Sequence, residues 1–149
     1  MEKISLPLAV IMERRLTSNR WVPIEWEAIA VLPDEGEAPE AGRVVFADDE
    51  ATHYIYSGFS VELHRDEAEN YFLNIGGTDP KVFVMWRLED EVAKPYQVSV
   101  SFGEAARWMD SGESVDGVVM TREIAVWLSE YVAANYVPEV KLPRKRMVK

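Results

Sequence analysis

The chain has 149 residues, of which 48% are hydrophobic and 28% charged, and a formal net charge of −10. A chain of this size buries roughly 70% of its unfolded surface around one core, so we expect a single domain that folds without disulfides or a structural metal. Because cysteine is absent, disulfides, thiolate metal sites and cysteine nucleophiles are excluded, and His53 and His64 are the only imidazoles.

The first apolar run, residues 6–12, is too short to cross a bilayer and contains Pro7. It is followed by Glu13, Arg14 and Arg15, where a secretory signal would carry small residues before its cleavage site. We therefore expect a soluble, cytoplasmic protein without membrane insertion.

Alternating hydrophobicity predicts a strand pair at the start of the chain. Apolar residues occupy every second position from Ile24 to Leu32, and the segment around Val10 shows the same spacing. Residues 33–42 follow, with two prolines, two glycines and four acids, and predict a mobile surface loop.

Five further strands are predicted in the middle of the chain, at Arg43 to Phe46, Thr52 to His64, Tyr71 to Ile75, Lys81 to Leu88 and Tyr96 to Ser101. Turn residues separate these strands, and we interpret residues 76–80 as a hairpin turn. Because the connections are too short for helical crossovers, we expect antiparallel neighbours.

Helical spacing replaces the alternation near Ser101. Ser101 and Glu104 predict a capping box at the start of a first helix, and Gly112 predicts its end. A second helix is predicted after Thr121 and before Pro138. The expected fold is α+β, with a meander-like antiparallel sheet of about six to seven strands and two C-terminal helices packed on one side.

Charge divides the chain into an acidic body and a basic tail. Residues 1–139, the expected domain, contain all 26 acidic side chains and 11 of the 16 basic ones, a net charge of −15. Such a body repels nucleic acid phosphates, so a nucleic-acid partner is not expected. Residues 140–149 are expected to be a flexible tail, which is either a docking arm or a solubilising terminus. Its candidate contact residues are Lys141, Arg144, Lys145 and Arg146.

Glu62, His64 and Asp66 are the first candidate site. On a continuous strand they would share one face, where they could bind a divalent ion or orient a general base. Neighbours on one face are about 7 Å apart, so convergence on one ion requires the strand to bend. We favour the simpler interpretation of a solvated strand face, with Asp66 beginning a turn or a helix cap.

A second candidate surrounds the first hairpin and combines Arg14, Arg15 and Arg20 with Trp21 and Trp26. Guanidinium groups bind carboxylate or phosphate through paired hydrogen bonds and also stack on indoles, so this rim could hold an anionic ligand or an acidic segment of a partner. The alternative, which we favour, is a solvated loop whose arginines neutralise nearby acids and whose tryptophans lie in the core.

Common catalytic motifs are missing. The chain has no Walker loop, no G-x-G-x-x-G after a strand, no G-x-S-x-G elbow and no H-E-x-x-H. Seryl and histidyl side chains cannot be assigned to a triad, because a triad is defined by geometry. No catalytic residue and no cofactor is therefore predicted.

The order of several short motifs resembles bacterial proteins of domain of unknown function 3305. The motifs are Met12-Glu13-Arg14-Arg15, Asn19-Arg20-Trp21 with Trp26, Val31-Leu32-Pro33, Asp66-Glu67-Ala68-Glu69-x-Tyr71, Val98-x-Val100-Ser101-x-x-Glu104-Ala105, Gly112-Glu113-x-Val115-Asp116-x-Val118 and the closing basic cluster. The resemblance covers almost the whole chain. It implies a setting beside molybdenum-containing formate dehydrogenases, and some members carry the label of molybdopterin guanine dinucleotide biosynthesis proteins. This chain lacks the glycine-rich phosphate loop that such a nucleotidyltransferase needs.

We therefore expect a non-catalytic accessory protein that binds a protein partner, such as a molybdoenzyme or its maturation factor. The alternative is a small-molecule or cofactor-binding domain, possibly an enzyme of molybdopterin metabolism, with a pocket near Glu62, His64 and Asp66. Self-association through an exposed strand edge is a third possibility.

Overall fold

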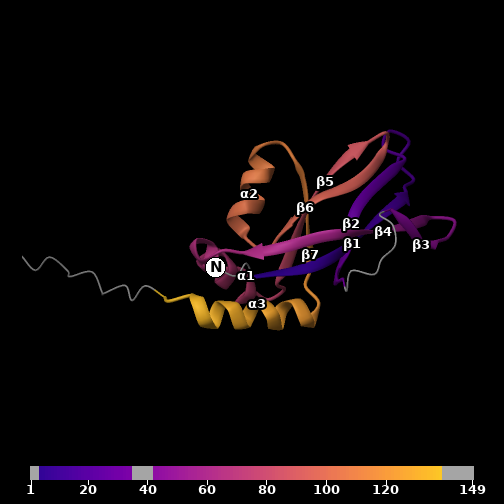
Figure 1. Cartoon of the computed structure of the whole chain (residues 1–149). Helices are drawn as coiled ribbons and strands as arrows, with labels where there is room; N and C mark the ends of the chain where they lie inside the picture. The colour runs from indigo at the N-terminus through magenta and orange to yellow at the C-terminus, as the bar shows by residue number, and fades with distance from the viewer. Residues whose placement is uncertain (1–3, 35–41, 139–149) are drawn as a thin grey trace, which may run out of the picture.

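The computed structural model describes residues 4–34 and 42–138 and has the α+β architecture that the sequence predicts (Figure 1). Its elements in chain order are β1 (Ile4–Leu16), β2 (Ile24–Pro33), β3 (Arg43–Ala47), β4 (Ala51–Leu63), the 3-10 turn η1 (Arg65–Glu67), α1 (Ala68–Ile75), β5 (Lys81–Glu89), β6 (Val92–Ser99), α2 (Phe102–Asp110), β7 (Ser114–Val119) and α3 (Arg122–Asn135).

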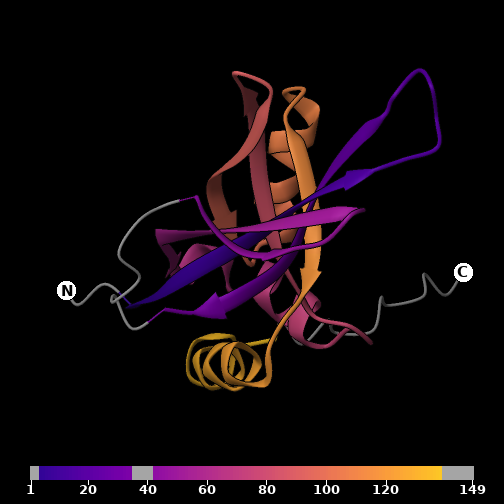
Figure 2. The same ribbon diagram turned by 90° about the vertical axis from the view of Figure 1, so that its right-hand side faces the viewer.

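The strands form two antiparallel sheets instead of the single predicted one. The first sheet has the order β2-β1-β4-β3 and the second the order β6-β5-β7. Each sheet comes from one continuous stretch of the chain. The first ends with β4, and α1 separates it from the second. The hairpin of β1 and β2 projects beyond the other elements (Figure 2).

Two β-bulges change which side chains of the first sheet face the core. The β1–β2 register moves from Ile11 opposite Ala30 to Met12 opposite Ala28, which leaves Ile29 as an extra residue. The single apolar face predicted through Leu32 is therefore wrong beyond Ala28, since Leu32 is 36% exposed.

The second bulge lies in β4, where two residues of that strand lie opposite Ala9 of β1. One of them, Gly58, has a φ of +90°, a conformation that favours glycine because it has no Cβ. The bulge shifts the alternation of β4, so that Tyr56 and Val61 are both buried.

The predicted strand from Tyr71 to Ile75 is wrong, because these residues belong to helix α1. The interpretation of residues 76–80 as a hairpin turn fails with it, since they connect α1 to β5. Tyr71 and Asn74 are three positions apart and both buried, as expected for one face of a helix. The segment is short and contains two aromatic residues, which favour strands. In the prediction this propensity outweighed the three-residue spacing, which is the weaker signal.

Both predicted C-terminal helices are present, but strand β7 lies between them and was not predicted. Ser101 Oγ accepts a hydrogen bond from the Glu104 N–H at 3.2 Å, and Gly112 has a φ of +83° beyond the helix end. The Ser101 N–H donates to Ser99 Oγ at 3.1 Å instead of to Glu104, so one half of the predicted capping box is replaced.

The two C-terminal helices pack in different places. Both contact α1, but α3 also contacts β2, whereas α2 also contacts β5 and β7. The core joins both sheets to α3 through apolar side chains with 0% exposure, namely Leu8, Val10, Met12, Val82, Val84, Ile124 and Leu128. No helix in residues 4–34 and 42–138 is long and apolar enough to span a membrane.

Asn74 is the most deeply placed polar side chain in α1, at 1% exposed. Its amide Nδ2–H₂ donates to the carbonyls of Lys81 at 2.7 Å and Val100 at 3.0 Å, and its Oδ1 accepts from the Lys81 N–H at 2.9 Å. One side chain thus satisfies main-chain groups at the start of β5 and after the end of β6. These bonds hold α1 to the second sheet.

Candidate functional site

The hairpin tip, residues 17–23, presents the largest exposed aromatic side chain of the described structure. Asn19 Oδ1 accepts from the Trp21 N–H at 2.9 Å, and Thr17 Oγ1 accepts from the Asn19 N–H at 3.2 Å while donating to the carbonyl of Val22. These bonds hold a defined loop. The side chain of Trp21 is nevertheless 83% exposed, and Arg20 beside it is exposed too.

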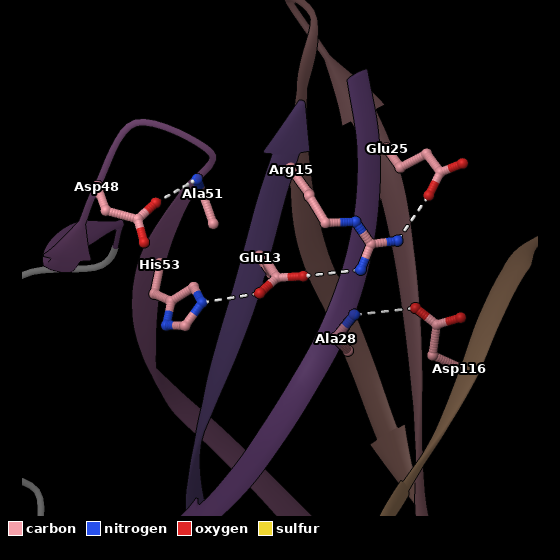
Figure 3. A network of polar contacts seen from close by, with 8 residues as sticks. All are labelled: Glu13, Arg15, Glu25, Ala28, Asp48, Ala51, His53 and Asp116. Atoms are coloured by element: carbon pink, nitrogen blue, oxygen red, sulfur yellow. Dashed lines mark hydrogen bonds and ion pairs between the residues drawn. The ribbon is translucent and has the colours of Figure 1, made fainter. Parts of the chain in front are cut away.

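Arg15 is neutralised by its neighbours. Its guanidinium donates to Glu25 at 2.7 Å and to Glu13 at 3.4 Å, and the hydrogen bond to Glu25 raises the pKa of Arg15 (Figure 3). Glu13 also contacts His53 Nε2 at 2.9 Å. Within the described ranges Arg14 and Arg20 form no ion pair. The predicted basic rim is therefore a mixed surface in which acids surround Arg15.

The two predicted tryptophans have different surroundings. Trp26 is half-buried and packs against Tyr54, with ring centroids 6.0 Å apart, whereas Trp21 extends into solvent. Among the described residues, no guanidinium lies over either indole. Across the part of the chain that the structure describes, the one cation–π pair joins Arg87 to Tyr96, 4.6 Å from the ring centroid. The favoured interpretation, which placed both tryptophans in the core, is therefore wrong for Trp21.

Below the tip lies a hollow of about 420 Å³, which we call the indole groove. Its lining residues are Glu13, Arg15, Val22, Ile24, Glu25, Trp26, Glu27, Trp86, Leu88 and Asp116. They come from both sheets, because β2 lies beside β7. The groove thus begins at the tip and extends to the junction of the sheets.

Asp116 of β7 connects the two sheets at this groove. Its Oδ2 accepts the main-chain N–H of Ala28 at 2.9 Å and the indole Nε1–H of Trp86 at 2.8 Å (Figure 3 shows the bond to Ala28). One carboxylate thereby satisfies an N–H of β2 and fixes the Trp86 ring in β5. Residue-by-residue reasoning missed Asp116. The only signal for it was its place in the motif from Gly112 to Val118 that resembles the family.

Glu62 and His64 line a different pocket of about 390 Å³, which we call the polar pocket. The other lining residues are Gly58, Phe59, Ser60, Tyr96, Gln97, Val98 and Glu104. His64 Nε2 is 4.0 Å from Glu62 Oε2, but Asp66 lies in η1 and does not line the pocket. In residues 4–34 and 42–138 no three His, Asp or Glu side chains are grouped to hold a metal ion. The structure therefore brings two of the three predicted residues together and separates the third.

The backbone N–H of His64 donates to the Tyr71 hydroxyl at 3.1 Å, which joins the end of β4 to helix α1. Burial raises the pKa of Tyr71 to about 12, because the phenolate would lose its hydration. This hydroxyl is a neutral structural group at physiological pH.

The lining of the polar pocket also includes Tyr96 of β6 and Glu104 of α2. The sequence alone did not connect these two residues with Glu62 and His64.

Two other expected contact regions have different outcomes. The tail residues Lys141, Arg144, Lys145 and Arg146 lie outside the described residues. Strand β3 is an edge of the first sheet and all five of its residues are exposed, and self-association through such an edge stays a hypothesis.

Residues 7–146 match the family of proteins of unknown function DUF3305. The chain belongs to this family. The resemblance predicted from the sequence is thereby confirmed over nearly the full length. No curated protein and no solved structure matches the chain significantly.

Family membership supplies no catalytic residue, but the motifs that resembled DUF3305 now have positions in the fold. Asn19, Arg20 and Trp21 lie in the hairpin tip, and Trp26 and Asp116 line the indole groove below it. The same end of this family member therefore carries the tip and the junction between the sheets.

Proposed function

We propose that this member of the DUF3305 family is a non-catalytic accessory protein that binds a protein partner through its hairpin tip. The observation that carries the proposal is the 83% exposure of Trp21 on a loop that is held by its own hydrogen bonds. Tryptophan and arginine are the residues that most often dominate binding energy at protein interfaces. A loop that is already ordered loses little conformational freedom on binding, so the tip suits such a role.

The proposed partner is a molybdoenzyme such as formate dehydrogenase, or one of its maturation factors. The support is the resemblance described in the sequence analysis, which implies a setting beside molybdenum-containing formate dehydrogenases. Arg14, Arg20 and the basic tail residues remain the proposed cationic contacts. Arg15 is assigned a lesser role, because Glu25 and Glu13 already bind its guanidinium.

The test is affinity capture from the native host with the tagged full-length chain. Recovery of a dehydrogenase subunit or a maturation factor is expected with the wild type and strongly reduced with Trp21→Ala or Arg20→Glu. Matched controls are Val137→Ser, which changes an equally exposed apolar residue, and Arg122→Glu, which reverses an exposed charge at the start of α3. Failure to recover such a protein with folded wild type, or equal recovery with all variants, would contradict the proposal.

A second candidate function is binding of a small ligand in the polar pocket, for which molybdopterin-like compounds and nucleotides are the ligands to test. The supporting observation is that Glu62, His64 and Glu104 line one hollow. A ligand at 100 times its dissociation constant should stabilise the fold by about 2.7 kcal/mol, measured as a rise in melting temperature. A rise that His64→Ala abolishes would favour this function. No rise across metals, nucleotides and molybdopterin-like compounds would count against it.

A further inference from the structure

Two half-buried indoles from different sheets line the indole groove. Trp26 comes from β2 and Trp86 from β5, and the bond from Trp86 Nε1–H to Asp116 fixes the second ring. The face of an indole carries negative electrostatic potential and attracts guanidinium and ammonium groups, more so where water is partly excluded. The groove therefore has an aromatic lining that suits a cation.

Carboxylates dominate the charge of the same groove, which is lined by four acidic side chains and one basic one. The basic one, Arg15, holds its guanidinium between Glu13 and Glu25 (Figure 3). These two acids thus already bind the kind of group that the groove suits. The other two carboxylates, Glu27 and Asp116, can still accept hydrogen bonds from a cation. Within the described ranges Glu27 forms no ion pair, and Asp116 accepts its hydrogen bonds through Oδ2 alone.

We infer that the indole groove binds an arginine or lysine side chain from a basic segment of a partner protein. The charge of the chain favours this occupant, since residues 1–139 have a net charge of −15 and repel an acidic segment. The place of the groove favours it too, because Val22 belongs both to the hairpin tip and to the groove lining. A partner that covers Trp21 would reach the groove. The inference rests on the proposed accessory function and names the chemistry of the partner segment.

The test uses the purified full-length chain and two synthetic peptides. One is a short glycine-serine peptide with three arginines, and the other carries neutral citrulline, which has almost the same shape, at those positions. The indole N–H signals of the five tryptophans are followed by NMR during titration. Saturable shifts of the Trp26 and Trp86 signals are expected with the arginine peptide only. The signals of Trp108 on α2 and Trp127 on α3 should not move.

Charge variants locate the contact. Glu27→Gln removes an exposed carboxylate without a described ion pair, so the fold should be kept, and affinity for the arginine peptide should fall about fivefold. Glu27→Lys should reduce it further. Glu69→Gln on α1 is the matched control, because it removes an exposed carboxylate outside the groove lining and should leave affinity unchanged.

Several results would overturn the inference. They are the absence of shifts, equal shifts with the citrulline peptide, tighter binding of an acidic peptide, and unchanged affinity in Glu27→Gln. The accessory function fails separately. If the arginine peptide does not bind but Trp21→Ala loses the captured partner, the groove inference alone is wrong. If the peptide binds and no molybdoenzyme or maturation factor is captured, the proposed function alone is wrong.

Discussion

Asn74 and Asp116 are two polar side chains that connect separate elements, and they differ in how many of their polar atoms form hydrogen bonds. Asn74 is 1% exposed and directs three hydrogen bonds to the main chain around β5 and β6. Asp116 is half-buried beside the groove and forms two hydrogen bonds through one oxygen. The difference indicates that Asn74 serves the fold alone, while Asp116 keeps an acceptor atom for the basic segment inferred above.

The largest expected effect is that of Asn74→Ala. The substitution removes three buried hydrogen bonds and leaves main-chain groups of Lys81 and Val100 without partners, which should cost about 4 kcal/mol of unfolding free energy. Urea denaturation measures the change. Asn135→Ala, which removes a single bond to the Tyr131 carbonyl, is the control and should cost less than about 1 kcal/mol. Equal losses in the two variants would show that the three bonds of Asn74 stabilise the fold no more than the single bond of Asn135.

Asp116→Ala should have the next largest effect, about 2 kcal/mol. It removes two charge-assisted hydrogen bonds, but water can reach the half-buried site and replace part of them. The same denaturation experiment applies, with Asp79→Ala in an exposed loop as the control. A loss as large as that of Asn74→Ala would mean that the fold depends on Asp116 just as strongly.

Alkaline pH should weaken the fold through Tyr71. Because burial raises its pKa in the fold from 10.0 to about 12, the unfolded chain releases this proton first. The contribution is complete below pH 10 and is lost as pH rises through about 12. Tyr71→Phe should therefore flatten the decline of stability in that range, by at most about 1.4 kcal/mol per pH unit. An unchanged slope in urea denaturation at several pH values would show that this hydroxyl is not shielded.

Gly58→Ala should cost about 1 kcal/mol, because alanine is strained at a φ of +90°. An added Cβ would meet no atom within 4 Å, so the cost lies in the backbone alone. Ser60→Ala, two residues further along the strand, is the control and should change stability by less than about 0.5 kcal/mol. A larger loss at Gly58 would mean that the bulge supports more of the first sheet than its own turn.

The smallest effect is expected for Trp21→Ala, within about 0.5 kcal/mol of wild type, because the side chain is 83% exposed. Thermal unfolding measures it. The most exposed aromatic side chain of the described structure would then contribute almost nothing to folding, so an effect of its loss on partner capture would be an effect on binding. A fall of 2 kcal/mol would instead show that the tip packs against the fold.

Sequence reasoning succeeded where a local pattern has one structural outcome. The apolar spacing from Ile124 to Val132 exists because α3 buries that face, and Thr121 caps its start through the Ile124 N–H. The alternation around Val10 correctly predicted a strand. The family resemblance could also be recognised from the sequence, because it depends on the order of short motifs and not on three-dimensional geometry.

The failures arise where distant contacts decide. Residues 71–75 suit a strand by propensity, but packing of α1 against α3 makes them helical. A bulge is defined by the register between two strands, so the sequence of one strand does not reveal it. For this reason Leu32 was wrongly predicted to lie on the buried face of its strand. Asp116 and Trp86 are 30 residues apart, and no spacing rule connects them.

The separation of the sheets along the chain has a consequence for synthesis on the ribosome. All four strands of the first sheet lie before residue 64, so they can pair while β5 to β7 and α3 are still being made. Until those later elements have been synthesised, the side chains of Leu8, Val10 and Met12 lack the residues of the second sheet and α3 that bury them in the core. During that interval the nascent chain exposes the side chains that later form its core, and chaperones that recognise apolar segments would have their target in its N-terminal half.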